Sequence, residues 1–386
     1  MIKLKVLVAI DSFKGSLSSI DAGEITAAAI RDVDKNIDVK IFPLADGGEG
    51  TVDALTRGLG GKIILTEVIG PLGNKIKSRY GIIPSKNIAV IEMADAAGIT
   101  LVPAEKKNPL HTTTYGLGEL ILQAANNGCR EFIIGIGGSA TNDCGLGMLM
   151  ALGVKFFDAE GNAVGIFGGD LKNVATVDVS NLNPILRECK FKIACDVTNP
   201  LYGENGCSAV YAPQKGATPE IVKAMDAYIK NFSAIVESQL GLTGAEIFGA
   251  GAAGGLGYAF HTFLGGKLES GINLVLDAVQ IKKSLATADI VITGEGRLDF
   301  QTAMGKAPIG IAKLAKKINP AVKVIAVCGA ATPDAVEVNQ RGIDAYFPIL
   351  HAVTTLDDAI KFENAKLNLY QTVTQIFRLV SGFNGK

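Results

Sequence analysis

The sequence has no excess of charge of either sign and no apolar run long enough to cross a membrane. Lys and Arg number 37 and Asp and Glu number 38, giving a formal net charge of -1, so neither nucleic acid nor an anionic membrane surface is an expected partner. The longest apolar runs, such as residues 322–331, fall well short of the roughly 20 residues that a spanning helix needs. The N-terminal apolar run is short and ends at Asp11, which is typical of a first strand rather than a signal peptide.

Metal-binding and redox motifs are also missing. The six cysteines include no CxxC pair, and none of the three histidines stands at ligand spacing from a cysteine. A structural zinc site is therefore not expected. Unpaired cysteines fit reduced thiols in a reducing compartment, and we expect a cytoplasmic protein.

The familiar nucleotide and hydrolase motifs do not occur. The sequence contains neither GxxxxGK[ST] nor GxSxG, which excludes a P-loop and a nucleophile elbow. One GxGxxG is present at Gly249, Gly251 and Gly254, but no strand precedes it, so we interpret it as tight helix packing or a small anion-binding loop. Ser139 follows two glycines but has no partner histidine nearby, which favours a loop that grips substrate or phosphate.

What the sequence has in abundance is glycine, with 46 among 386 residues, or about 12 %, against a typical 7 % or so. The glycines gather where strand-length apolar runs end and helical patterns begin. Five such runs are KVLVAI, VKIFPL, EFIIGI, ADIVIT and VKVIAV. Apolar strands that alternate with helices predict a parallel α/β sheet.

Two stretches depart from this alternation and predict a second domain. Residues 66–109 and 144–216 contain short strands joined by Gly and Pro turns. The length also exceeds that of one ordinary core. We therefore predict an α/β protein with two domains and an active-site cleft between them. The predicted domains are a discontinuous Rossmann-like parallel-sheet domain (residues 1–66, 113–140 and 284–386) and an inserted β-rich α/β domain (residues 67–112 and 141–283).

Polar residues beside the glycine clusters are the candidates for chemistry, because ligands of open parallel sheets bind beyond the carboxyl ends of the strands. Lys14 and Ser16 stand at a strand-to-helix turn that suits phosphate, although an ordinary turn with a serine N-cap would look the same. Acids beside such loops fit Mg²⁺ binding and proton abstraction, and each could instead cap a helix. The acids concerned are Asp11, Asp46, Glu49, Asp143, Asp196, Glu295 and Asp299.

Taken in order, the loop motifs resemble those of the bacterial glycerate kinase family over essentially the whole chain. They are DSFKGSLS (11–18), PLADGGEGT (43–51), GPLG (70–73), NPLHTTTYGLGELI (108–121), GIGGSATND (135–143), CDVTNPLYG (195–203), YAPQKGA (211–217), GAAGGLG (251–257), TGEGRLDFQT (293–302) and the pair Gly305-Lys306. One departure is Cys144, where the family often has glycine. The resemblance implies a two-domain enzyme that phosphorylates D-glycerate with ATP and Mg²⁺, more often at the 2-position than at the 3-position.

Within that resemblance we assign roles as hypotheses. Phosphoryl transfer needs phosphate donors, a bridging metal and a base, and a substrate carboxylate favours a bidentate arginine. We expect catalysis by Asp196, Lys14 and Arg297; substrate binding by Ser139, Thr141, Asn142 and Arg79; phosphate or ATP binding by Ser12, Ser16, Gly47, Gly48, Gly294 and Glu295; and metal binding by Asp46 and Glu49.

Other functions stay open at this point. The chain could be a kinase of another small hydroxy acid, or a non-catalytic two-lobed protein that closes on an organic acid. An NAD-dependent oxidoreductase is disfavoured by the poor setting of the GxGxxG motif. The expected partners are glycerate and ATP, without nucleic acid or membrane, and a homodimer is left open.

Overall fold

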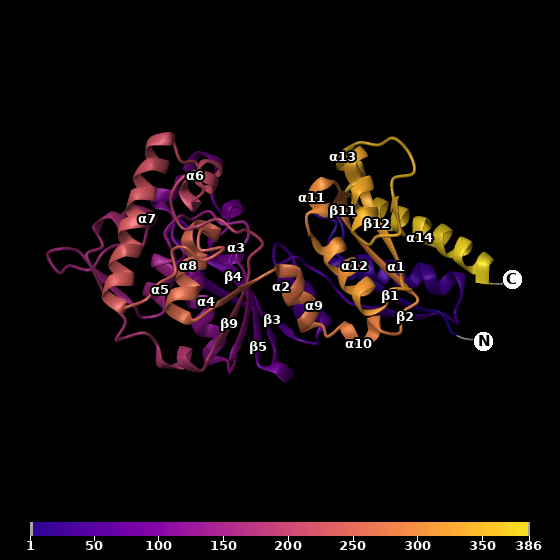
Figure 1. The fold of residues 1–386 in the computed structure, drawn as a ribbon, viewed down its shortest axis with the longest axis horizontal. Coiled ribbons are helices and arrows are strands. Elements are labelled where there is room, and N and C mark those ends of the chain that lie inside the picture. Colours follow the sequence, from indigo (N-terminus) through magenta and orange to yellow (C-terminus); the bar gives the residue numbers. More distant parts are fainter. Residues whose placement is uncertain (1–2, 385–386) are drawn as a thin grey trace. The chain divides into compact units, whose positions relative to one another are not determined.

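The structure is a computed structural model that describes residues 3–384. The chain divides into two compact units, each with its own sheet (Figure 1). Unit 1 contains residues 1–46, 53–59 and 272–386, and unit 2 contains residues 47–52 and 60–271. Within residues 3–384, no helix is long and apolar enough to cross a membrane.

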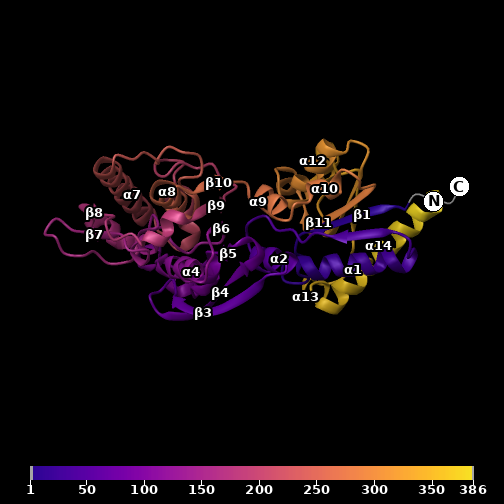
Figure 2. The same cartoon turned by 90° about the horizontal axis from the view of Figure 1, so that it is seen from below.

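Unit 1 is built on a parallel five-stranded sheet with the order β13-β12-β11-β1-β2. Helices α1 and α14 cover one face, and α10 and α12 lie on the other (Figure 2). Five of the six residues of β1 are buried, as expected for a strand covered on both faces. The strands are β1 (Lys5–Ile10), β2 (Asp38–Ile41), β11 (Ile290–Leu298), β12 (Lys323–Ala331) and β13 (Ala345–Pro348). The helices are α1 (Ser19–Val33), α2 (Thr51–Gly58), α9 (Gly271–Ala278), α10 (Lys282–Leu285), α11 (Phe300–Ala303), α12 (Ala307–Ile318), α13 (Leu356–Ala359) and α14 (Phe362–Asn384), with a 3₁₀ segment η8 (Pro333–Arg341).

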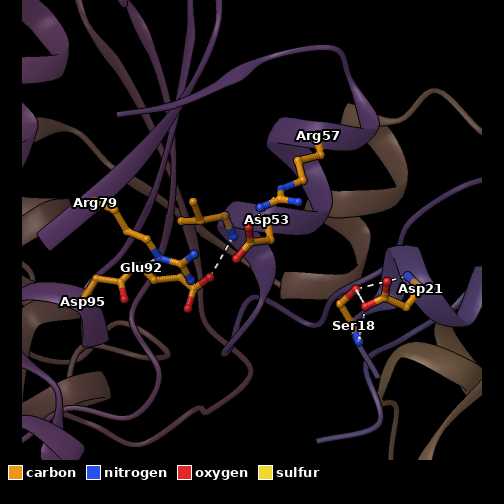
Figure 3. Close-up of polar contacts among 8 residues, drawn as sticks. Ser18, Asp21, Asp53, Arg57, Arg79, Glu92 and Asp95 are labelled. Atoms are coloured by element: carbon orange, nitrogen blue, oxygen red, sulfur yellow. Dashed lines mark hydrogen bonds and ion pairs between the residues drawn. The ribbon is translucent and has the colours of Figure 1, made fainter. Parts of the chain in front are cut away.

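The start of α1 ties the first two strands of unit 1 together. Ser18 and Asp21 form a reciprocal capping box (Figure 3), in which the Ser18 hydroxyl accepts from the Asp21 N–H at 3.1 Å. The next residue, Ser19, donates to the Ile10 carbonyl at 2.6 Å and accepts from the Leu44 N–H at 2.8 Å. The chain segments that follow β1 and β2 are therefore fixed side by side at the carboxyl edge of the sheet.

Unit 2 contains a mixed six-stranded sheet with the order β10-β9-β6-β5-β4-β3 (Figure 2). The pairs β3–β4 and β4–β5 are antiparallel, and the remaining pairs are parallel. The strands are β3 (Lys62–Ile69), β4 (Lys75–Ile83), β5 (Ile88–Glu92), β6 (Glu131–Gly135), β9 (Lys190–Ala194) and β10 (Lys267–Glu269), with a separate hairpin of β7 (Lys155–Phe157) and β8 (Thr176–Asp178). The helices are α3 (Ala94–Ala97), α4 (Tyr115–Asn126), α5 (Leu146–Ala151), α6 (Cys207–Tyr211), α7 (Pro219–Leu240) and α8 (Ala252–Leu264), and the 3₁₀ segments are Pro84–Lys86, Ile99–Leu101, Ala104–Lys106, Pro109–His111, Gly168–Asn173, Pro184–Glu188 and η7 (Pro213–Lys215).

The predicted fold class is confirmed: strands from the two ends of the chain form a parallel sheet, and the middle forms a second sheet. The boundaries differ from the expected ones. Residues 113–140 were assigned to the Rossmann-like domain, but their strand β6 pairs with β5 and β9 in unit 2. Strand β3 also lies in unit 2, and residues 272–283 lie in unit 1. The reason is that both sheets contain buried parallel strands followed by glycine loops, so the local pattern does not reveal which sheet a strand joins.

Candidate active site

Unit 1 gathers three carboxylates at the carboxyl edge of its sheet. Asp11 follows β1 directly, and its N–H donates to the Gly294 carbonyl at 2.9 Å. Burial raises the pKa of Asp11 well above its usual value, and the charges of Asp46 and Glu295 raise it further, while Lys306 opposes them. Burial also raises the pKa of Glu295, which accepts a hydrogen bond from Thr302. Such crowded acids favour a cation among them.

This acidic group is an incomplete metal site by itself. Among the residues that the structure describes, no three His, Cys, Asp or Glu side chains form a ready-made metal site. Mg²⁺ at nucleotide sites typically takes one or two carboxylates and fills its other positions with water and substrate phosphates. The oxygen donors of the group therefore fit Mg²⁺ that arrives together with a nucleotide.

The turn that follows Asp11 is held by buried apolar anchors. Phe13 and Leu17 form a backbone bridge and are both buried, while Lys14 between them is exposed. The Ser12 N–H donates to the Asp11 carboxylate at 2.6 Å. Within residues 3–384, the buried Ser16 hydroxyl oxygen has no hydrogen-bond partner. The anchors thus hold a lysine and two serines at the sheet edge, as a phosphate-binding turn requires.

Gly294 and Arg297, two predicted site residues of the TGEGRLDFQT motif, are not part of the acidic group. Gly294 is buried inside β11, where an added Cβ would lie 2.0 Å from the Val327 carbonyl oxygen of β12. Close strand packing therefore accounts for this glycine without any phosphate. Arg297 has a side chain that is 67 % exposed, with its Nε 3.9 Å from the Asp299 carboxylate. The side chain of this arginine is therefore accessible to a ligand, while its backbone is part of β11 and pairs with Ala330 of β12.

In unit 2 the Gly47 loop packs on the ends of β6 and β9. Gly47 has φ of +87°, and an added Cβ would lie 2.4 Å from the Cβ of Ala194. A Cβ at Gly135 would lie 2.1 Å from the Gly47 carbonyl oxygen. Glycine is required at both positions. Gly48 and the exposed Glu49 are thereby brought to the carboxyl edge of the second sheet.

A buried carboxylate at the end of β5 holds the other side of this loop. Glu92 accepts the Val52 N–H at 2.7 Å (Figure 3), and burial raises its pKa to about 7. Nearby, the Arg79 Nε lies 3.2 Å from the Asp95 carboxylate. No local sequence pattern identifies Glu92, because its partner Val52 is 40 residues away.

Glu92 makes stability depend on pH. Its folded-state pKa is raised from 4.5 to about 7, so its contribution to stability is complete below pH 4.5 and is lost as the pH rises to 7. Glu92→Gln removes this titration but keeps an acceptor for Val52. We compare the free energy of unfolding of the variant with that of wild type. From pH 5 to pH 8 this difference should shift in favour of the variant by on the order of 3 kcal/mol. Urea unfolding at both pH values measures the gain, and an equal difference at both would contradict it; Glu188→Gln, at an exposed ion pair, is the control.

Asp196 follows β9 at the same edge of unit 2. Its carboxylate oxygens lie 3.2 and 3.4 Å from the Gly271 N–H, and the residue is exposed. The neighbouring Cys195 N–H donates to the Glu269 carbonyl at the end of β10. The backbone around Asp196 is thus fixed, while its carboxylate stays accessible to a substrate.

The loop after β6 carries Ser139, Thr141 and Asn142, all of them buried. The Asn142 amide donates to the Ser208 hydroxyl at 2.9 Å. Within the described part of the chain, the Thr141 hydroxyl oxygen and the Asn142 amide oxygen have no hydrogen-bond partner. The ammonium group of Lys215 donates to the Ser139 hydroxyl. This loop presents unsatisfied polar atoms, which a polar ligand could satisfy.

Asp143, the next residue, is a structural anchor. Its carboxylate accepts from the Thr114 N–H at 2.8 Å and from the Thr114 hydroxyl at 2.7 Å, and also from the N–H groups of Gly145 and Gly147.

Cys144 has φ of +50°, a backbone conformation that favours glycine, the residue that the family often has at this position. Of the GxGxxG glycines, Gly254 packs on this loop, since a Cβ there would lie 2.2 Å from the Thr141 carbonyl oxygen. Tight packing thus explains Gly254 without a dinucleotide.

The predicted site residues therefore fall into two groups, one at the carboxyl edge of each sheet. Unit 1 holds Ser12, Lys14, Ser16, Asp46, Gly294, Glu295 and Arg297, and unit 2 holds Gly47, Gly48, Glu49, Arg79, Ser139, Thr141, Asn142 and Asp196. Asp11 was only one of seven candidate acids, and Glu92, Thr302 and Lys215 were not among the predicted site residues. Asp11, Lys215 and Thr302 lie inside motifs of the family resemblance, so the sequence contains a signal for them, whereas Glu92 lies outside all of these motifs.

Comparisons with known proteins give a uniform result. The model of the Glycerate kinase family matches residues 6–381. A Haemophilus influenzae protein named glycerate kinase is 45 % identical over 98 % of this chain and 99 % of its own, and an Escherichia coli protein named glycerate 2-kinase is 44 % identical over 93 % of each. A crystal structure from Salmonella typhimurium LT2, whose name refers to glycerate kinase 2, is also similar to this chain. The match covers 100 % of each chain, with a TM-score of 0.91 and 41 % sequence identity.

Proposed function

Because this chain belongs to the glycerate kinase family, we propose that it transfers the γ-phosphoryl group of ATP to D-glycerate and forms 2-phosphoglycerate. The full-length match to the family carries the proposal. The name of the Escherichia coli relative, glycerate 2-kinase, favours the 2-position. The two sheet edges supply the chemistry that this reaction needs, namely phosphate contacts, acids and hydrogen-bonding groups for a hydroxy acid.

In unit 1 the proposed role is to hold the nucleotide phosphates. Lys14, with the Ser12 and Ser16 hydroxyl groups, suits phosphate oxygens, and the buried Ser16 oxygen lacks a partner among the described residues. Asp46 and Glu295 are acids of the crowded group beside Asp11. Asp46 and Glu49 are the residues proposed to hold Mg²⁺. The ion, when bound, neutralises charge on the transferring phosphates. Gly47 and Gly48 provide a backbone that a phosphate can approach.

In unit 2 the proposed role is to bind and activate glycerate. Asp196 takes the proton from the hydroxyl that attacks the phosphorus atom. Ser139, Thr141 and Asn142 hydrogen-bond the substrate oxygens. Arg297 is the first candidate for pairing with the glycerate carboxylate, and Arg79, which contacts Asp95, is the second.

An activity assay tests the proposal. Purified protein, ATP and Mg²⁺ are incubated with glycerate, tartronate or other hydroxy acids, and ADP release is measured. Adding enolase identifies 2-phosphoglycerate, because enolase converts that isomer and not the 3-isomer. A preference for another acid would point to the alternative kinase. Calorimetric binding of glycerate without any ADP release would instead support the non-catalytic binding protein.

Lys14→Ala is expected to lower kcat by about two orders of magnitude, since it removes the exposed cation of the proposed phosphate turn. The buried anchors Phe13 and Leu17 remain, so the melting temperature should not change. The control is Lys35→Ala, an exposed lysine between α1 and β2, which should turn over normally. Near-normal kcat in folded Lys14→Ala would remove this residue from the phosphate site.

Two further expectations stay predictions. A cytoplasmic location is supported by the cysteines, all six of which are free in the structure. A homodimer is also still a prediction, and light scattering of the purified protein would decide the matter.

A further inference from the structure

Lys215 is a fully enclosed lysine at the end of η7. Only 2 % of the residue is exposed. Its ammonium group donates to the Ser139 hydroxyl oxygen at 2.7 Å and to the Thr141 carbonyl oxygen at 2.6 Å. Both acceptors belong to the loop after β6, which is 74 to 76 residues away in the sequence. The Lys215 side chain therefore anchors the loop after β6 through two hydrogen bonds.

The buried charge of Lys215 is not balanced by a direct ion pair. Both of its hydrogen-bond acceptors are neutral oxygens. The titratable groups that face it are the thiol of Cys207, on α6, and the carboxylate of Asp143. The Asp143 carboxylate accepts its hydrogen bonds from Thr114 and from the backbone of Gly145 and Gly147. Burying a cation on neutral acceptors costs free energy, so a loop held only for stability would be better served by an uncharged residue.

The hydrogen bond to Ser139 fixes the direction of its hydroxyl group. An ammonium group can only donate, so the Ser139 oxygen must accept from Lys215 and its own proton must point elsewhere. Within residues 3–384, the structure contains no acceptor for that proton. The same loop carries the buried Thr141 and Asn142 oxygens that also lack partners there. The loop thus contains a directed donor at Ser139 beside two enclosed oxygens that lack partners in the described part of the chain.

We propose that Lys215 is a positioning residue of the substrate site, which commits the Ser139 hydroxyl to donate to an oxygen of glycerate. The ammonium group also places a positive charge directly behind the loop that receives this anionic substrate. The inference rests on the proposed role of residues 139–142 in binding glycerate, and its test separates the two.

The first experiment is a double-mutant cycle with Ser139→Ala, Lys215→Met and the combined variant. We expect each single change to raise the KM for glycerate about 10-fold or more, since each removes the same directed donor, while the KM for ATP stays within about twofold. The combined variant should be no worse than the poorer single one. Lys215→Arg should recover part of the loss, because guanidinium is also a charged group that only donates.

The pH dependence supplies a readout that a purely structural lysine would not move. Burial lowers the pKa of Lys215 to about 8, and burial raises the pKa of Cys207 to about 12, so the thiol stays neutral in this range. Above pH 8 the neutral Lys215 amine can accept a hydrogen bond from the Ser139 hydroxyl. The hydroxyl proton is then no longer committed to the substrate. We expect the KM for glycerate of the wild-type protein to rise above pH 8, and that of Lys215→Arg to stay flat.

The control is Lys316→Met in unit 1, where the ammonium group donates to the Val322 carbonyl and the Asp344 carboxylate. This variant should melt at a lower temperature and keep the wild-type KM for glycerate. If Ser139→Ala binds glycerate normally, the proposed role of the loop fails. If Ser139→Ala is impaired but folded Lys215→Met is normal, or if their effects add, only the inference on Lys215 fails. Should Lys215→Met not fold, a rise in KM above pH 8 that persists in Lys215→Arg would overturn the inference.

Discussion

Replacing Asp196 with asparagine is expected to lower kcat by two or more orders of magnitude and to leave the fold intact. The residue is exposed, and the hydrogen bond that its carboxylate accepts from the Gly271 N–H can be accepted equally by an asparagine oxygen. The substitution therefore removes a negative charge and a basic oxygen, and little packing. Loss of a general base costs about 10² to 10⁴ in rate, so a large fall in kcat should accompany an unchanged melting temperature.

The measurement is steady-state kcat from coupled ADP release, together with thermal melting of the same preparation. Asp158→Asn is the matched control, because Asp158 is a partly exposed aspartate of unit 2 that also accepts backbone N–H groups, those of Glu160 and Asn162. It should retain full activity. If folded Asp196→Asn turned over within about threefold of wild type, another group would have to take the hydroxyl proton.

The position of Asp196 at a strand end was predictable from sequence, and so were most of the candidate loops. A buried apolar run followed by glycine and a polar residue is a local signal, and it located Asp11, Ser139 and Asp196 correctly at sheet edges. The same signal does not say which sheet a strand joins. Strand β6 has the pattern of β1, but it pairs with β5 and β9, because pairing depends on contacts between distant segments.

The residues that support the loops could not be identified from local pattern. Lys215 is 76 residues from Ser139, and Glu92 is 40 residues from Val52. Their roles come from three-dimensional contacts that no spacing rule encodes. Gly294 shows the reverse error, because a glycine required for strand packing has the same sequence signature as a glycine that approaches phosphate.

Asp11→Asn is expected to make the unliganded protein more stable while it lowers kcat by about two orders of magnitude or more. Burial and the neighbouring charges of Asp46 and Glu295 raise the pKa of Asp11, which means that its charged form is disfavoured in the folded state. An asparagine at this position relieves that crowding and can still accept the Ser12 N–H. A residue that costs stability yet persists in a loop of the proposed site is the pattern expected of a functional group.

The test compares melting temperature in Mg²⁺-free buffer with kcat over a range of Mg²⁺ concentrations. Asp344→Asn is the opposing control in unit 1. Although partial burial acts against it, hydrogen bonds from Lys316 and the Val324 N–H lower the pKa of Asp344. That carboxylate therefore stabilises the fold, and its loss should lower the melting temperature without changing kcat. Asp11→Asn should melt a few degrees higher than wild type. It should also need more Mg²⁺ for its residual activity, since one carboxylate of the acidic group of Asp11, Asp46 and Glu295 is gone. A variant that melted lower and kept normal turnover would show that Asp11 serves the fold, as Asp143 does, and not the transfer of phosphate.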